Sequence, residues 1–347
     1  MSKVTVLAGI VLIALSTSTL FTLSNRTAAG PAAGSLAAKR SSFFPQQKYF
    51  DVFNESDAPE IAKHYAGLIK KYGRELRDQR KRHIEFWAGK TNTDRCKGRV
   101  GMIEASMLYV MIREDKPSHV LEIGALCGTS TRWILEALRI NGKGKLSTFD
   151  LHDWSKEYMD KSHVEEGRWD FYFEDVFKFL KTSKGKKMQE TIDLFFIDAL
   201  HRNSFAQVYT RELLAAHSHR VSVFVHDIYA PFLIPPYKEC QQKMDLVTYK
   251  DEIKCVTEKA KKIAASEEYH GIDIFYGPTQ AGGEGLELTS WLARTGRSNG
   301  IVTFSPYAAP TFAMQVVKAF QDAKIPVNQI NNPAVFFELN ESSERAS

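Results

Sequence analysis

The first fifty residues of the chain contain neither aspartate nor glutamate, and the first acidic residue is Asp51. Within them, Val4–Leu23 is an uncharged run that follows Lys3 and is just long enough to span a bilayer. Its strongly apolar part, residues 6–15, is also the size of a signal-peptide core. We therefore predict a signal anchor or a signal peptide over residues 1–27, and favour the anchor because no clean Ala-x-Ala cleavage site follows.

This N-terminus predicts the secretory pathway, either as a single-pass membrane protein with its domain on the lumenal side of the ER or Golgi, or as a secreted protein. Three Asn-x-Ser/Thr sequons, at Asn25, Asn54 and Asn340, are compatible with a glycoprotein of that pathway. The absence of early acidic residues also fits a transit peptide for a plastid or another organelle, so this alternative stays open.

Cysteine is scarce: there are four in the chain, and no Cys-x-x-Cys pair occurs, which argues against a structural zinc site. Cys127 lies in a glycine-containing turn, where we interpret it as a small buried residue. Cys240 and Cys255 can bridge a loop if the protein resides in an oxidising compartment.

The chain also lacks a strong charge bias, internal repeats and heptads, and its formal net charge is +5. The basic stretch 70–83 has no interleaved aromatic residues, so we interpret it as a solvated helix face and expect no nucleic acid partner. A chain of 347 residues supports one large core with N-terminal appendages. The predicted divisions are the anchor or signal (1–27), a linker (28–50), N-terminal helices (51–115), a catalytic domain (116–340) and a disordered tail (341–347).

Short apolar runs alternate with helical spacing through the centre of the chain, which predicts an α/β fold with a doubly wound, mostly parallel sheet. The predicted fold also includes N-terminal helices over 57–87 and 100–112, of which the second is amphipathic. A C-terminal insert is expected on the acceptor side of the domain. The predicted strands are 119–123, 145–150, 168–175, 191–198, 221–227, 271–277 and 333–339. The predicted helices of the domain are 130–138, 176–182, 205–216 and 310–323.

The glycine turn after the first of these strands has the spacing Glu-x-Gly-x-x-x-Gly-x-Ser, from Glu122 through Gly124 and Gly128 to Ser130. A strand, a glycine turn and a helix together present backbone N–H groups and a helix N-terminus to a ligand. The spacing lacks the third glycine of dinucleotide-binding loops. It resembles the first motif of class I S-adenosylmethionine (SAM) methyltransferases, and the resemblance implies a Rossmann-like sheet and SAM contacts from these residues and Cys127.

Two acidic residues end the next two strands and complete the expected cofactor site. Asp150 ends the second strand, where a carboxylate can accept hydrogen bonds from both hydroxyls of a ribose. Asp175 ends the third strand and is placed to meet the adenine amino group. The order Glu174-Asp175-Val176 is similar to the Gly-Asp-Ala of the family, with glutamate in place of glycine.

The stretch Ile192–His201 reads Ile-Asp-Leu-Phe-Phe-Ile-Asp-Ala-Leu-His. It resembles the Asp-Leu-hydrophobic-hydrophobic-Ile-Asp-Gly-x-His signature of the branch that contains cation-dependent macrolide-sugar O-methyltransferases and cephalosporin-hydroxylase-like proteins. The resemblance implies that Asp198 and Asp227 bind a divalent cation, Mg²⁺ or Mn²⁺, and that His201 takes the proton of the acceptor hydroxyl. His226 stands where the branch has a carboxylate ligand, and a histidine there favours Mn²⁺ over Mg²⁺.

The resemblance implies a SAM-dependent O-methyltransferase with a small-molecule or glycan hydroxyl as acceptor, a sugar or glycoside foremost. Two alternatives stay open: a non-catalytic SAM-binding or interaction module, which has no need of His201 and Asp227, and an NAD-dependent oxidoreductase. The expected partners are the acceptor, the membrane through Val4–Leu23, and a second copy of the chain in a homo-oligomer.

Overall fold

The computed structural model describes residues 41–45, 50–52, 56–88, 96, 100–159, 161–201, 203–228, 284, 287–288, 291–292, 294–304, 309–327 and 334–341. Its elements in chain order are β1 (Phe50–Asp51), α2 (Ala58–Trp87), α3 (Met102–Asp115), β2 (His119–Ile123), α4 (Thr129–Asn141), β3 (Lys145–Asp150), the 3₁₀ helix η2 (Trp154–Tyr158), α5 (Lys161–Glu165), β4 (Trp169–Phe173), α6 (Val176–Leu180), α7 (Ser183–Gln189), β5 (Leu194–Ile197), α8 (Asn203–Tyr209), the π-helix η3 (Thr210–Leu214), β6 (Val221–Val225), β7 (Gly300–Thr303), α13 (Pro310–Asp322) and β8 (Val335–Leu339).

One sheet of eight strands organises the molecule, in the order β1-β7-β8-β6-β5-β2-β3-β4. The central pairs, β6 with β5, β5 with β2, β2 with β3 and β3 with β4, are all parallel. Strand β8 lies antiparallel between β6 and β7. The sheet is therefore doubly wound and mostly parallel, as the sequence predicts, with one reversed strand from the C-terminal part of the chain.

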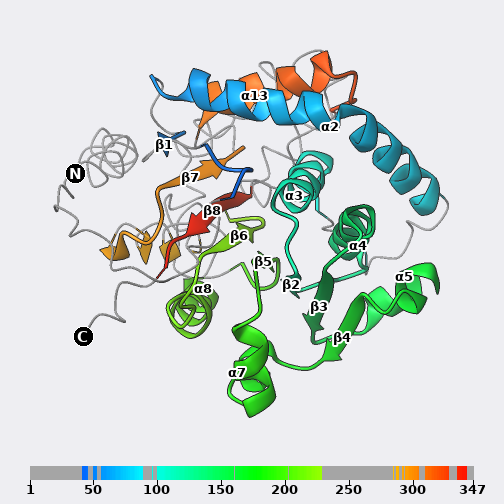
Figure 1. Cartoon of the computed structure of the whole chain (residues 1–347), viewed down its shortest axis with the longest axis vertical. Coiled ribbons are helices and arrows are strands. Elements are labelled where there is room, and N and C mark those ends of the chain that lie inside the picture. Colours follow the sequence, from blue (N-terminus) through cyan, green and yellow to red (C-terminus); the bar gives the residue numbers. More distant parts are fainter. Residues whose placement is uncertain are drawn as a thin grey trace, which may run out of the picture.

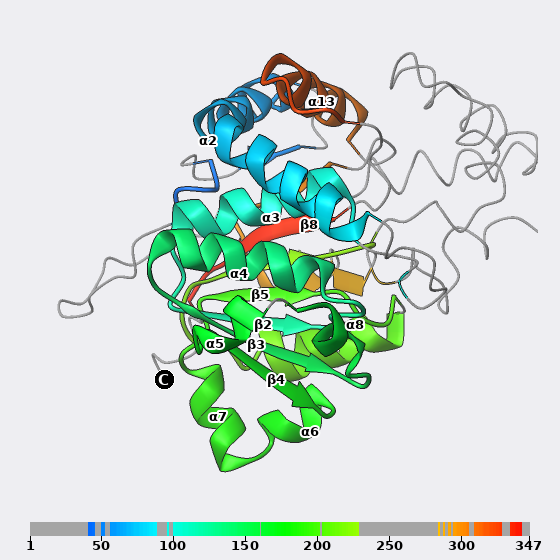
Figure 2. The same cartoon turned by 90° about the vertical axis from the view of Figure 1, so that its right-hand side faces the viewer.

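Alternate residues of the central strands enter two separate cores. Val120 and Phe196 pack in the first core, under α2, α3, α4 and α13, whereas Leu121 and Phe195 pack in the second, with α6 and α8. Because successive side chains of a strand point to opposite faces, strands that are apolar throughout need cover on both sides. Figure 2 shows α3 and α4 on one side of the sheet and α6 and α7 beyond its other side.

The N-terminal helices belong to the same body as the sheet. Helix α2 is a single helix and packs along α13, so segments more than 200 residues apart lie side by side (Figure 1). Helix α3 corrects the prediction of an amphipathic helix, because every residue from Ile103 to Ile112 is buried. It is enclosed by α2, α4 and the sheet, so no side of the helix between Ile103 and Ile112 faces solvent.

Most predicted strands and helices of the domain are found within a few residues of their expected bounds. The third strand is shorter than predicted, β4 at Trp169–Phe173, and the helix after β5 changes to a π-helix at Thr210. The strand predicted at 271–277 lies outside the described residues. So do the insert 231–265, Cys240 and Cys255. Of the predicted linker, residues 41–45 and 50 are described, and Phe43 and Phe44 are buried in the first core.

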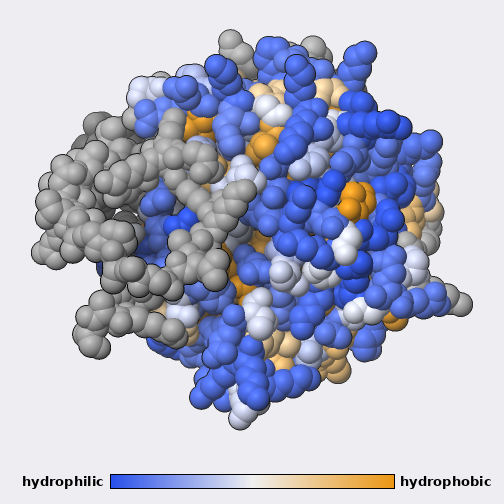
Figure 3. Space-filling model, viewed as in Figure 1, coloured by the Kyte–Doolittle hydropathy of each residue, from blue (hydrophilic) through white to orange (hydrophobic). Residues whose placement is uncertain are grey.

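The described part of the chain contains no helix that is long and apolar enough to cross a membrane. The predicted anchor Val4–Leu23 lies outside the described residues. On the face shown in Figure 3, the described surface is mostly hydrophilic, with hydrophobic residues in small separate patches.

Candidate active site

The glycine turn between β2 and α4 is built around two positions where only glycine fits. Gly124 has φ +86°, and a Cβ atom there would lie 1.8 Å from the carbonyl oxygen of Asp198. Gly128 has φ +77° and precedes the first residue of α4. The positive φ values reverse the chain, and the close approach at Gly124 sets the turn against the end of β5.

Glu122 supports this turn from inside the protein. Its carboxylate is fully buried and accepts hydrogen bonds from the hydroxyls of Ser130 (2.6 Å), Thr131 (2.8 Å) and Thr148 (2.8 Å). Burial raises the pKa of Glu122 to about 7, while these three hydroxyls oppose the rise. The Ser130 hydroxyl therefore points toward Glu122. If Ser130 contacts SAM, the contact is made by its backbone N–H group.

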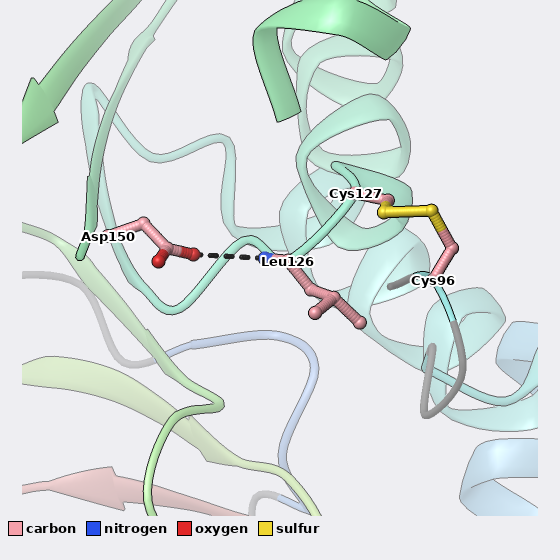
Figure 4. The surroundings of a disulfide bond; sticks show 4 residues. All are labelled: Cys96, Leu126, Cys127 and Asp150. Atoms are coloured by element: carbon pink, nitrogen blue, oxygen red, sulfur yellow. Dashed lines mark hydrogen bonds between the residues drawn. A yellow bond between two sulfur atoms is a disulfide. The ribbon is translucent and has the colours of Figure 1, made fainter. Parts of the chain in front are cut away.

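Cys127 corrects the interpretation of a simple buried residue, because it forms a disulfide with Cys96 (Figure 4). The two cysteines form a small buried cluster with Trp87, at the end of α2. The bond ties the turn to the segment that precedes α3. Its sulfur is thus occupied, which leaves the backbone as the part of Cys127 that can contact a cofactor.

Asp150 lies at the carboxyl end of β3, as predicted, and also shapes the turn. Its Oδ2 atom accepts hydrogen bonds from the N–H groups of Ala125 (2.8 Å) and Leu126 (3.0 Å), the second of which is drawn in Figure 4. Its Oδ1 atom accepts from the N–H of His152 at 2.8 Å. An ionised carboxylate has about four acceptor positions, so one remains beside those three bonds.

The predicted cofactor contact Asp175 and a stacked aromatic pair also lie near this edge of the sheet. Asp175 caps α6, where its carboxylate accepts a hydrogen bond from the N–H of Phe177 at 2.9 Å. His152 and Trp154, which follow Asp150, stack with ring centroids 4.3 Å apart and nearly parallel planes. The stacked pair presents an aromatic surface next to the predicted ribose site.

The predicted acceptor site is assembled from the carboxyl ends of β5 and β6, which are paired neighbours. Asp198, His201 and Asp227 each offer a ligand atom, and these atoms lie within 4.8 Å of one another. His201 Nε2 is 3.7 Å from both Asp198 Oδ1 and Asp227 Oδ2. Asp227 has φ +56°, a conformation that costs a non-glycine residue about 1–3 kcal/mol and that is common at functional sites.

His226 lies against the two carboxylates. Its Nδ1 atom is 3.0 Å from Asp198 Oδ1 and 3.4 Å from Asp227 Oδ1, and the ring is fully buried. Burial lowers the pKa of His226, but Asp198 and Asp227 outweigh it and raise the pKa to about 10. His226 therefore contributes positive charge beside the carboxylates, and it is His201 that joins them in the convergent set.

These surroundings shift the pKa values of Asp198 and Asp227 in opposite directions. Burial opposes ionisation of Asp198, but attraction to His226, and to His201 when that ring is protonated, holds the pKa of Asp198 below its usual range. Burial raises the pKa of Asp227 to about 6, with His226 opposing the rise and Asp198 adding to it. Two carboxylates this close need a cation between or beside them, and a divalent ion fits the oxygen-rich donor set.

Two buried glutamates approach the same cluster and were not identified as site residues from the sequence. The Glu104 carboxylate on α3 is fully buried and has no hydrogen-bond partner among the described residues, and burial raises its pKa to about 8. Its electrostatic neighbours are His226 and Asp227. Glu284 lies 3.3 Å from His201 through Oε2 and Nδ1. Neither glutamate belongs to a recognisable sequence motif. They are identified as site residues only because the structure buries both carboxylates beside the cluster.

Residues 121–228 match the family model described as "Methyltransferase domain". No curated protein matches the chain in sequence. Among solved structures, an O-methyltransferase from Streptomyces achromogenes involved in tomaymycin synthesis, solved with SAM, is 12% identical, covering 76% of this chain and 89% of its own, with a TM-score of 0.38. An O-methyltransferase from Bacillus cereus is 14% identical over 75% of this chain and 90% of its own, with a TM-score of 0.40.

A methyltransferase from Podospora anserina is 13% identical over 75% of this chain and 88% of its own, with a TM-score of 0.40. The family match carries the identification rather than these structures, and it spans the glycine turn, the acidic strand end at Asp150 and both halves of the acceptor site. Residues 121–228 thus match a methyltransferase domain, and the motifs that resemble those of class I SAM-dependent methyltransferases lie within or directly beside this range.

Proposed function

We propose that this protein transfers the methyl group of SAM to a hydroxyl group of a small molecule, with a sugar or glycoside as the leading acceptor. The observation that carries the proposal is the convergence of Asp198, His201 and Asp227 beside the glycine turn. A methyltransferase needs a place where an acceptor oxygen loses its proton next to the methyl donor, and these side chains provide acceptors for that proton.

SAM supplies the methyl group on a positively charged sulfur. We propose that the backbone of the turn from Gly124 to Gly128 holds its amino-acid part, with Glu122 keeping the turn in shape. Asp150 would bind the ribose through its remaining acceptor position, and the adenine would lie toward Asp175 and the stacked pair of His152 and Trp154.

At the acceptor, His201 would take the hydroxyl proton on Nε2 as the oxygen forms its bond to the methyl carbon and the carbon–sulfur bond breaks. Burial lowers the pKa of this imidazole, but Glu284, Asp198 and Asp227 outweigh it and raise the pKa above its ordinary, near-neutral value, which makes the ring a stronger base. A divalent ion beside Asp198 and Asp227 would offset their charges and lower the pKa again. Asp198 and Asp227 would hold a divalent cation, which lowers the pKa of a hydroxyl bound to it. We propose Mg²⁺ or Mn²⁺ for that ion, with His226 as a further ligand once the ion is bound.

The test is methyl transfer from tritium-labelled SAM to a panel of glycosides, catechols and amines, with the product identified by mass. We expect label to appear on a hydroxyl oxygen of at least one acceptor. Label on nitrogen alone would replace the proposal of O-methylation. Saturable SAM binding without transfer to any acceptor would favour a non-catalytic SAM-binding module, and tighter binding of NAD than of SAM would favour an oxidoreductase.

We also propose that the N-terminus carries the domain into the secretory pathway through Val4–Leu23. The disulfide between Cys96 and Cys127 supports an oxidising compartment, where such bonds persist. In eukaryotic cells the full chain should fractionate with membranes, and a chain that begins near Ser41 should be soluble. A soluble full-length product whose mature N-terminus lies beyond Ala28 would indicate a cleaved signal or a transit peptide instead.

A further inference from the structure

Glu284 brings a third carboxylate to His201 from a distant part of the chain. It lies in the C-terminal region, 83 residues beyond His201, and its Oε2 atom is 3.3 Å from His201 Nδ1. The side chain of Glu284 is only 2% exposed. A carboxylate this deeply buried is costly unless it has partners, so its position against one nitrogen of His201 calls for an explanation.

Among the described residues, His201 is the main polar neighbour of Glu284. Burial raises the pKa of Glu284, while the contacts with His201 and with the hydroxyl of the fully buried Tyr209 oppose the rise. Both partners can donate a hydrogen to a carboxylate, and both favour its charged form. The carboxylate is therefore placed to act as the acceptor for an N–H group at Nδ1 of His201.

The two nitrogens of His201 face different neighbours. Nδ1 is 3.3 Å from Glu284 Oε2, an ion-pair contact that is not fully aligned as a hydrogen bond, whereas Nε2 is 3.7 Å from the oxygens of both Asp198 and Asp227. That second distance is too long for a direct hydrogen bond, so neither carboxylate occupies the lone pair of Nε2. The neutral ring gains most when its single hydrogen is on Nδ1 and its lone pair is on Nε2.

We propose that Glu284 is a positioning residue that holds His201 in the Nδ1–H tautomer, with the Nε2 lone pair directed to the site between Asp198 and Asp227. The role of that lone pair, which is to take the proton of the acceptor hydroxyl, rests on the proposed function. The same division of labour operates wherever a carboxylate orients an imidazole that acts as a base or as a metal ligand. Glu284 itself does not contact the reacting atoms.

Three variants separate this role from a general structural one. Glu284→Gln keeps the size of the side chain and removes its charge, and Glu284→Asp keeps the charge but shortens the reach. The control is Glu212→Gln, because Glu212 forms its ion pairs with Lys181 at 3.2 Å and with Arg211 at 2.9 Å rather than with His201. Thermal unfolding of all three establishes that each variant is folded.

In methyl transfer, Glu284→Gln should lower kcat by about 10–100-fold, the usual effect of removing a carboxylate that orients a functional imidazole. The KM for SAM should stay unchanged, because SAM is bound at the other strand ends. Glu284→Asp should retain more activity than Glu284→Gln, and the control should match the wild type. Wild-type kcat in Glu284→Gln would overturn the positioning role while leaving the proposed function intact.

A second measurement does not depend on activity. In protein labelled with ¹⁵N-histidine, the His201 signals are assigned from their loss in His201→Gln and recorded at a pH where the ring is neutral. The wild type should show Nδ1 protonated and Nε2 bare, and Glu284→Gln should shift the ring toward the Nε2–H tautomer. A wild-type ring already protonated on Nε2, or one unaffected by Glu284→Gln and Glu284→Asp, would overturn the proposal even if no acceptor is ever found.

Discussion

Cys127, in the glycine turn, is covalently bonded to Cys96, which precedes α3. The next residue back along the turn, Leu126, donates its N–H to the carboxylate of Asp150. The disulfide therefore holds one residue of the turn, and the carboxylate at the end of β3 holds the residue before it (Figure 4). A covalent bond outside the sheet thus fixes the backbone that is expected to meet SAM.

Removing this disulfide should lower the free energy of unfolding. It closes a loop of 31 residues, for which the chain-entropy argument gives about 3–4 kcal/mol. Chemical denaturation of the double variant Cys96→Ala/Cys127→Ala should show a lower midpoint than the wild type, and SAM should bind more weakly because the turn is less fixed. Equal midpoints for the variant and the wild type would contradict a stabilising role of the bond.

Replacing Asp150 by alanine should weaken SAM binding ten- to a hundredfold. In the proposed complex the carboxylate would accept a charge-assisted hydrogen bond from the ribose, worth about 1.5–3 kcal/mol, and its loss also frees the N–H groups of Ala125 and Leu126. Titration calorimetry measures the change directly. The control is Asp153→Ala, an exposed aspartate three residues on, which should bind SAM like the wild type. Undiminished affinity in folded Asp150→Ala would refute the assignment.

The protein should lose stability in acid partly through His119. Burial, together with the charge of Lys145, lowers the pKa of this histidine to about 4. The ring is held between the hydroxyls of Thr191 and Ser147 at 2.8 and 2.9 Å. Because the folded state binds the proton more weakly than the unfolded chain does, this stability is complete above pH 6.5 and is lost as the pH falls toward 4.

The measurement is the free energy of unfolding at several pH values for the wild type and for His119→Gln, which does not titrate. Between pH 6.5 and 4 the wild type should lose on the order of 2 kcal/mol more than the variant. Parallel pH profiles would show that His119 titrates normally. His217, whose buried ring also has a lowered pKa, is present in both proteins and cancels in the comparison.

Chelation should silence methyl transfer if a divalent ion bridges Asp198 and Asp227. Activity after EDTA treatment should return with Mg²⁺ or Mn²⁺, and Mn²⁺ should serve at least as well if His226 becomes a ligand. Asp227→Asn should lower activity to a similar extent, because an amide binds a hard cation less strongly than a carboxylate does. Full activity after exhaustive chelation would remove the ion from the proposal and leave the other residues in their roles.

The sheet could be predicted because its strands are short apolar runs that end in glycine or in acid. The bounds of β2 and β3 coincide with the prediction, since His119–Ile123 and Lys145–Asp150 are closed by a glycine turn and by Asp150. The convergence of Asp198 and Asp227 follows from the parallel pairing of β5 and β6, which the alternation of strands and helices already implied.

The disulfide and the two buried glutamates could not be predicted in the same way. Cys96 stands in no pattern with Cys127, and their pairing depends on how the segment before α3 packs against the turn. Glu104 and Glu284 belong to helical segments whose sequences give no sign that a carboxylate faces inward. Tertiary packing, rather than local propensity, decides the place of each of these residues.

The most direct test of the acceptor site compares the wild type with His201→Ala under saturating SAM. Calorimetry should show the same affinity for SAM, because His201 belongs to the end of β5 rather than to the glycine turn. Single-turnover transfer of a labelled methyl group should be slower by about 10²–10⁴-fold, the usual contribution of a general base. Transfer at the wild-type rate in folded His201→Ala would contradict the central claim that this histidine accepts the proton of the acceptor hydroxyl.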